Sequence, residues 1–373
     1  MSFWGTFPAN YRAAEVQAIR AAVQAGECAA VIGLSGAGKS NLLGYLAARQ
    51  AAAEQPRYVL VDGNRLRQPT AAAFLELMTE SLEQAMPGTT SGAQSARESD
   101  ALGRLDIAIG QRAGASICFL LDWSLLLDRD GRLFAGQEQG LWANLRALRD
   151  RHKYELTYVA ATRHALPRDN ELAELFFGHS LWLGPLSDDD ARWNVARYAE
   201  RVGQRWEDGL IEAIAAASGR YPALLRAVCE ACAAGCPPEP QALARHAAVA
   251  ARIEEFWADR PDDAELRAAG LDTIELLMSA RPHRFDTAQL TAKESRLLQA
   301  LQARAGEVYD KDDLIRAVWP EDRVYESGVR DDSLAQLVRR LREKIEPEAG
   351  KPRYIQTVPG RGYRFVKQTG GSE

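Results

Sequence analysis

One eight-residue segment constrains the fold of this chain more than any other feature: Gly33-Leu34-Ser35-Gly36-Ala37-Gly38-Lys39-Ser40. It fits the pattern G-x-x-x-x-G-K-[ST], with an apolar run at Ala29–Gly33 before it and a helical pattern at Asn41–Arg49 after it. That context distinguishes a phosphate-binding loop from an ordinary glycine turn. Glycines let backbone N–H groups turn inward, and the helix N-terminus adds partial positive charge. We therefore predict a nucleotide site made by Gly33, Ser35, Gly36, Ala37, Gly38, Lys39, Ser40 and Asn41.

Polar side chains with distinct expected roles lie in this loop and at two later strand ends. Lys39 is expected to reach the β- and γ-phosphates of ATP, and the Ser40 hydroxyl to ligate Mg²⁺. Asp122 ends a buried apolar strand, and a carboxylate there is either a strand terminator or part of the Mg²⁺ site; the phosphate loop favours the metal. Arg163 ends a later strand, beside the expected γ-phosphate. The predicted catalytic residues are Lys39, Asp122 and Arg163, and the metal residues are Ser40 and Asp122.

The order of the patterns along the chain predicts the fold class, which is α/β. Five apolar runs read as strands separated by helical stretches, the sign of a parallel sheet: Ala29–Gly33, Tyr58–Asp62, Ile117–Asp122, Leu156–Thr162 and Ser180–Gly184. Ser187 and the three aspartates after it then start a long helical region. We predict a parallel-sheet core at 1–184, a helical lid at 185–257, a linker with one helix at 258–285, and a further domain at 286–373.

Composition excludes several classes of protein. The 373 residues are 46% hydrophobic and 26% charged, an ordinary mixture for a folded chain rather than a disordered one. No apolar run approaches the ~18 residues of a membrane span, and Met1–Arg12 lacks the pattern of a secretory signal. Five cysteines, an odd number, do not make a disulfide framework. These observations predict a cytoplasmic protein with no membrane association.

The C-terminal region of the chain has a different pattern. A helix is expected from Leu290, a short connection and a second helix over Val308–Trp319, and a third helix over Asp332–Ile345, where apolar residues recur on one face. Two short strand-like runs follow, separated by Pro359-Gly360-Arg361-Gly362, which is typical of a hairpin. Three helices and a hairpin with a basic tip predict a winged-helix domain.

Charge in this domain departs from the chain average. The chain carries a formal net charge of −5, yet Ser333–Lys367 has nine basic residues and three acidic ones, a local net charge of +6. A solvated helix face with a charged turn is the alternative interpretation. The positive charge persists into the hairpin, however, which favours a face that binds phosphates of nucleic acid.

This C-terminal region resembles the OmpR/PhoB-type winged-helix DNA-binding family. The residues in common are Leu290-Thr291-x-Lys293-Glu294, Val318-Trp319, Arg340-Leu341-Arg342-x-Lys344-Ile345 and Thr357-x-x-Gly360-x-Gly362-Tyr363-Arg364. The resemblance implies that the third helix enters the major groove of double-stranded DNA and that the hairpin reaches the minor groove. It makes DNA-binding candidates of Gln336, Arg339, Arg340, Lys344, Arg361 and Arg364, with Lys367 nearby. Two features depart from the family: the β-platform before the first helix is short, about Arg284 to Gln289, and no receiver-type acidic pocket precedes the domain.

Residues 10–235 resemble a STAND or AAA+ type ATPase, closest to STAND and the Orc/Cdc6-like group. The resemblance rests on the phosphate loop, Asp122, Thr162-Arg163 and Gly184-Pro185. It implies ATP and Mg²⁺ as cofactors. It also implies that Tyr11 and Arg12 lie over adenine, that Pro185 contacts the nucleotide, and that the weaker match at Gly219–Leu225 belongs to the lid.

Two departures from this family bear on hydrolysis. Trp123 follows Asp122 where the family usually has an acid that orients the attacking water, and an indole cannot take that role. Glu174–His179, before the fifth strand, contains no arginine finger. We expect tight nucleotide binding with slow or negligible hydrolysis.

Together these motifs predict a nucleotide-switched, DNA-binding transcriptional regulator that forms an ATP-dependent homo-oligomer. An alternative is an ATPase of a mobile-element or anti-phage defence system, in which DNA or a partner protein is the trigger. A third is a non-hydrolysing scaffold.

Overall fold

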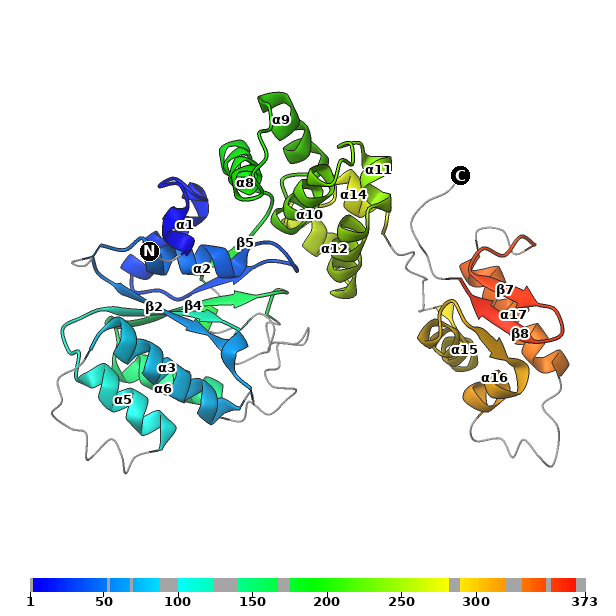
Figure 1. The fold of residues 1–373 in the computed structure, drawn as a ribbon. Coiled ribbons are helices and arrows are strands. Elements are labelled where there is room, and N and C mark those ends of the chain that lie inside the picture. Colours follow the sequence, from blue (N-terminus) through cyan, green and yellow to red (C-terminus); the bar gives the residue numbers. More distant parts are fainter. Residues whose placement is uncertain are drawn as a thin grey trace. The chain divides into compact units, whose positions relative to one another are not determined.

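The structure is a computed structural model, and it divides into two compact units, Met1–Met278 and Ser279–Glu373 (Figure 1). It describes residues 3–51, 54–67, 70–87, 100–123, 140–166, 175–176, 178–281, 289–319, 331–346 and 350–366.

The first unit is built on a parallel five-stranded sheet in the order β2-β3-β4-β1-β5. The strands are β1 (Ala29–Ile32), β2 (Arg57–Asp62), β3 (Ile117–Asp122), β4 (Leu156–Thr162) and β5 (Ser180–Trp182). Strands β1, β3 and β4 are buried along their whole length, which accounts for their unbroken apolar sequences. Because all strands run the same way, the residues after β1, β3 and β4 meet at one edge of the sheet.

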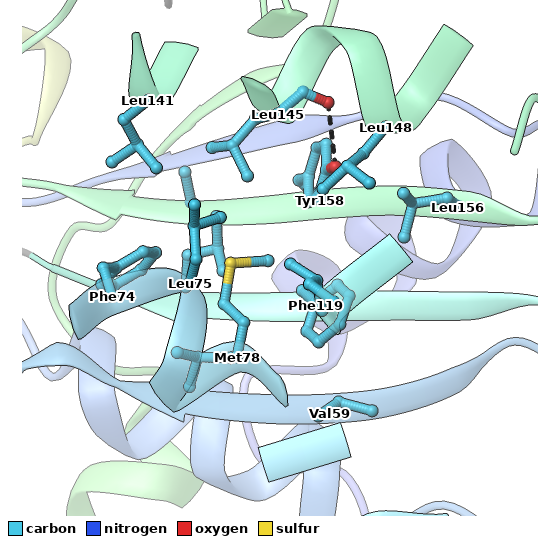
Figure 2. Close-up of a cluster of buried hydrophobic side chains, with 14 of the residues drawn as sticks. Val59, Phe74, Leu75, Met78, Phe119, Leu141, Leu145, Leu148, Leu156 and Tyr158 are labelled. Carbon is cyan, nitrogen blue, oxygen red and sulfur yellow. Dashed lines mark hydrogen bonds between the residues drawn. The ribbon is translucent and has the colours of Figure 1, made fainter. Parts of the chain in front are cut away.

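Helices cover both faces of this sheet (Figure 1). One face carries α1 (Ala13–Gln24) and α2 (Lys39–Ala48), and the other carries α3 (Ala71–Ala85), α5 (Ala101–Gly110) and α6 (Leu141–Arg151). Short 3₁₀ turns occupy Phe3–Thr6 and Gly63–Arg65. Figure 2 shows the core under the second face, where α3 and α6 pack on the strands through Phe74, Leu75, Met78, Leu141, Leu145, Leu148, Val59, Phe119, Leu156 and Tyr158.

A helical region follows β5, as the sequence predicts. It comprises α8 (Asp188–Arg201), α9 (Asp208–Ala217), α10 (Pro222–Ala233), α11 (Pro240–Arg245) and α12 (Ala247–Ala258). The Ser187 hydroxyl accepts a hydrogen bond from Asp190 N at 3.1 Å, and three acids occupy the first turn of α8. This is the helix start expected from the sequence.

The stretch expected to be a linker differs from the prediction. Residues 258–278 of this stretch belong to the first unit, so a connection between the units begins no earlier than Ser279. The single helix expected within 258–285 is two shorter ones, α13 (Asp263–Ala268) and α14 (Glu275–Met278). Gly270, at φ +64°, separates them. The physical reason is burial: Leu266, Leu271 and Leu277 are at most 1% exposed, so this stretch completes the core of the unit.

The second unit has the winged-helix arrangement. Its helices are α15 (Ala292–Ala303), α16 (Lys311–Val318) and α17 (Asp331–Ile345), and its antiparallel sheet has the order β6-β8-β7, with β6 (Val308–Asp310), β7 (Ile355–Val358) and β8 (Gly362–Phe365). Strand β6 was not expected from the sequence. Thr291 and Glu294 form a capping box at the start of α15. The apolar stripe of α17 is buried through Leu334, Leu337, Val338, Leu341 and Ile345. Of the expected β-platform, all but Gln289 lies outside the described residues.

Candidate nucleotide site and nucleic-acid interface

The phosphate loop, Gly33–Ser40, joins β1 to α2, with Gly36 at φ +82° and Gly38 at φ +88°. Gly33 N donates to Thr162 O at 3.0 Å, which fastens the loop to the end of β4. Among the described residues, the N–H groups of Gly38, Lys39 and Ser40 have no acceptor, and α2 has no side-chain cap. The buried Thr162 hydroxyl also lacks a partner there. Unpaired N–H groups at a helix N-terminus fit the phosphates of a nucleotide.

Lys39 lies inside this loop. Its ammonium donates to Gly33 O and, at 3.3 Å, to Leu34 O, and the residue is only 7% exposed. Burial lowers the pKa of Lys39 to about 8; the charge of Asp122 works against this lowering, and that of Arg163 adds to it. The structure therefore brings the three predicted catalytic residues into one group of interacting charges.

Asp122 ends β3 and is buried, whereas Ser40 is exposed at the start of α2. Trp123, the residue that replaces an expected acid, belongs to the core. Its ring is fully buried and packs on Phe74 and Trp142, with centroids 5.4 and 5.3 Å away. The segment 174–179, which contains no arginine finger, lies partly outside the described residues.

Arg163 does not stand free beside the loop. Its guanidinium pairs with Asp259 Oδ1 at 2.7 Å, and Asp259 Oδ2 accepts a hydrogen bond from Ser35 N at 2.9 Å. The neighbouring His164 pairs with Glu265 at 2.7 Å. Sequence reasoning missed both acids because they lie in the stretch read as a linker, where no local motif marks them.

The lid also touches the loop through the first turn of α10. Tyr221 Oη donates to Ser35 O at 2.6 Å, and Ala223 N donates to Gly36 O at 3.2 Å. A Cβ on Gly36 would lie 2.3 Å from the Ala223 Cβ, so only glycine permits this approach. The segment Gly219–Leu225, expected to belong to the lid, thus lies directly on the phosphate loop.

Tyr11 and Arg12, expected over adenine, are both buried next to this loop. The Arg12 guanidinium donates to Ala37 O and Gly184 O, both at 3.0 Å, and pairs with Glu15 at 2.6 Å. Its backbone N donates to Asp190 in α8. Arg12 therefore ties the loop, the turn after β5 and the lid together, a structural role that the sequence did not indicate. Tyr11 packs on Phe7 and Tyr45, and burial raises its pKa. Pro185 is partly buried.

The predicted DNA-binding residues of the second unit divide into two groups. Gln336, Arg339 and Arg340 on α17, together with Arg361 in the turn between β7 and β8, are exposed. Arg339 makes an intrahelical pair with Glu343 at 3.0 Å, and such exposed pairs hold a side chain only weakly. Arg364 is partly buried and donates to Gln356 Oε1 at 2.7 Å.

Lys344 is exposed and also has a partner within the unit. It pairs with the buried Glu294 carboxylate at 2.7 Å and donates to Gln289 O at 2.9 Å, which ties α17 to the start of α15. Arg342 likewise faces inward: it donates to Ile355 O and to the Thr357 hydroxyl, both at 3.0 Å. These contacts give two residues of the basic motif, Arg342 and Lys344, a structural role within the unit. Lys367 lies outside the described residues.

Glu346, just after α17, anchors the hairpin. Its carboxylate accepts hydrogen bonds from the backbone N–H groups of Arg353 (2.6 Å), Tyr354 (3.0 Å) and Ile355 (2.8 Å). The side chain thereby fixes the first residues of the wing to the end of the exposed helix. No local sequence signal marks it.

Comparison with known proteins identifies the second unit. Residues 286–365 match the family model described as "Transcriptional regulatory protein, C terminal", which confirms the resemblance expected for this region. Protein PetR of Rhodobacter capsulatus is 37% identical over 97 residues, covering 26% of this chain and 39% of that protein. The cholera toxin transcriptional activator of Vibrio cholerae is 38% identical over 78 residues, covering 21% and 26%. The chain thus spans well under half the length of these relatives.

Solved structures match over nearly the whole chain. The Aeropyrum pernix Orc1 protein in complex with DNA is 14% identical, with a TM-score of 0.41, covering 97% of this chain and 90% of that one. The motifs of the first unit resemble the same Orc/Cdc6-like group, but a TM-score below 0.5 is too low to define a common overall arrangement. Within the described residues of the chain, no helix has both the length and the apolar character needed to cross a membrane.

Proposed function

We propose that this chain is an ATP-binding transcriptional regulator whose nucleotide state changes its binding to double-stranded DNA. The observation that carries the proposal is the contact between lid and phosphate loop. Tyr221 and Ala223 of the lid, and Asp259 just after it, bind the backbone of the loop that offers N–H groups to phosphates. Phosphates that enter this loop meet the lid, so their affinity depends on the position of the lid. A nucleotide with different affinities for two lid positions shifts the balance between them.

Different residues of the site would bind the phosphates and the metal ion of ATP–Mg²⁺. The N–H groups at the start of α2 and the Lys39 ammonium would hold phosphate oxygens, while Ser40 and Asp122 would hold the metal. Mg²⁺ supplies charge neutralisation of the phosphates when it is bound. Because Trp123 is buried in the core, no side chain at that position can hold an attacking water. Slow hydrolysis follows, which suits a switch better than a motor.

DNA binding falls to the exposed face of the second unit. We assign base recognition to Gln336, Arg339 and Arg340, and backbone or minor-groove contact to Arg361. A single winged helix makes a modest interface of roughly 600–1,000 Å². Assembly of several copies with ATP would present several such units together and raise affinity through multivalency. We therefore propose an ATP-dependent homo-oligomer that works in the cytoplasm.

The test measures DNA binding of the full chain at fixed salt without nucleotide, with ATP–Mg²⁺ and with ADP–Mg²⁺. Sites for the assay come from selection on random DNA with each nucleotide in parallel. We expect ATP and ADP to give different affinities for the wild type, and Lys39→Ala to remove the difference. Lys153→Ala is the control, because Lys153 is an exposed lysine that lies outside the phosphate loop. Identical curves for all conditions would refute the switch, and sequence-independent, DNA-stimulated hydrolysis would favour the alternative of a defence or mobile-element ATPase.

A further inference from the structure

Asp259, at the end of α12, presents its carboxylate to the phosphate loop. One oxygen accepts from Ser35 N at 2.9 Å, and the other pairs with the Arg163 guanidinium at 2.7 Å. The side chain is only 6% exposed. A loop N–H and an arginine are donors that bind phosphate oxygens, so the carboxylate meets the loop as a phosphate would.

The point at which Asp259 contacts the loop indicates which phosphate of a nucleotide its carboxylate resembles. The N–H groups of Gly38, Lys39 and Ser40, at the start of α2, have no acceptor among the described residues. In a loop of this pattern such groups cradle the α- and β-phosphates, while the lysine extends toward the γ-phosphate. Asp259 instead binds at Ser35, before these groups, and its charge acts on Lys39. The N–H groups of Gly38, Lys39 and Ser40 therefore remain available, and they fit a diphosphate.

A γ-phosphate and the Asp259 carboxylate compete for the same position at the phosphate loop. Both are anions, and both need the donors of Ser35 and Arg163, so close approach of the two is repulsive. A second acid, Glu255, accepts from the Ser35 hydroxyl at 3.3 Å and adds negative charge at this end of the loop. A triphosphate that binds fully has to displace Asp259, and with it the end of α12.

We propose that Asp259 is a specificity-determining residue: its carboxylate stands in for a γ-phosphate, so the form in which Asp259 contacts the loop binds ADP in preference to ATP, and ATP binds by expelling this carboxylate. This inference deepens the proposed function and rests on it. It assigns the discrimination between the two nucleotides to a single side chain that touches the loop.

The experiment measures the dissociation constants of ADP and of a non-hydrolysable ATP analogue, both with Mg²⁺, for the full-length chain. We expect the wild type to bind ADP at least tenfold more tightly than the analogue. Asp259→Asn keeps the size of the side chain and one acceptor oxygen but removes the charge. It should lower this ratio by tenfold or more, mainly by tightening the analogue. Asp272→Asn, an exposed acid in the same region of the chain, should leave the ratio unchanged.

The outcomes separate the inference from the proposed function. If the wild type binds both nucleotides equally, or if Asp259→Asn retains the wild-type ratio, the role of Asp259 is refuted while nucleotide binding stands. If the wild type binds neither nucleotide, the proposed function itself fails. The wild-type ratio needs no variant, so a folding defect in Asp259→Asn does not leave the inference without a test.

Discussion

Glu346→Gln is expected to destabilise the second unit because Glu346 joins helix α17 to the wing. Its Oε1 accepts from Tyr354 N and Ile355 N, and its Oε2 accepts from Arg353 N and Tyr354 N. A glutamine has one acceptor oxygen. With that oxygen in the Oε1 position, its NH₂ group faces the Arg353 N–H donor to donor, so one hydrogen bond is lost and the others lose their charge.

The magnitude follows from these bonds. Hydrogen bonds to charged groups contribute about 1.5–3 kcal/mol each, so losing one and weakening two costs roughly 3 kcal/mol. The carboxylate at the C-terminal end of a helix is itself unfavourable by about 0.3–1 kcal/mol, and that cost is relieved. The hydrogen bonds outweigh the helix term, and we expect a loss of about 2–3 kcal/mol. Domains of this size are stabilised by only about 5–15 kcal/mol, so the effect is large.

The assay is urea unfolding of a fragment spanning residues 279–373, followed by fluorescence of Trp319, its only tryptophan. Glu343→Gln is the matched control, since Glu343 makes only an exposed pair with Arg339 and should cost less than about 0.5 kcal/mol. Removal of a negative charge would by itself tighten DNA binding. We expect Glu346→Gln to weaken it, because the wing loses its anchor. A loss of stability no larger than that of the control would refute the reasoning.

Two further predictions concern other contacts. Gly36→Ala should speed hydrogen exchange of the Ala223 N–H, because its new Cβ would overlap Ala223; Gly114→Ala, at a similar φ of +87° but with open space around it, shares only the backbone strain and should leave that exchange slow. Burial raises the pKa of Glu294, but hydrogen bonds from Lys344 and from the capping box outweigh it, so the pKa lies below the ordinary 4.5. The stability that Glu294 contributes is thus present above pH 4.5 and lost as pH falls through the lowered value. Urea unfolding of the same fragment should show this loss for the wild type and not for Glu294→Gln, and parallel pH curves for the two would contradict it.

The features of the structure that the sequence predicted are those whose cause is local. The phosphate loop is specified by residues that are consecutive in the chain, because its glycine conformations and the following helix depend on near neighbours. The strands of the sheet were visible as continuous apolar runs, since both faces of a central parallel strand are covered. The capping box at Thr291 and Glu294 likewise lies within one helical turn.

What the sequence left open depends on pairings between residues far apart in the chain. Arg163 was expected at the γ-phosphate, but its partner Asp259 lies 96 positions away and carries no motif. The pairing of Lys344 with Glu294 was not predicted either, because a basic side chain on a helix gives no sign of whether an acid lies against it. Arg12 and its contacts with the phosphate loop are of the same kind. Strand β6 is only three residues long and forms by pairing with β8, so its own sequence is too short to predict it.

The ion pair of Arg163 and the hydrogen bond of His164, directly after β4, have a mechanical consequence. Arg163 and His164 are consecutive, and each contacts an acid that follows α12: Asp259 directly after that helix, and Glu265 in the first turn of α13. Both residues lie in the bend directly after β4, and the two acids belong to one short stretch of chain, so displacement of one acid also shifts the backbone that carries the other. A ligand that displaces Asp259 from Arg163 therefore also perturbs the contact between His164 and Glu265, which couples the phosphate loop to α13.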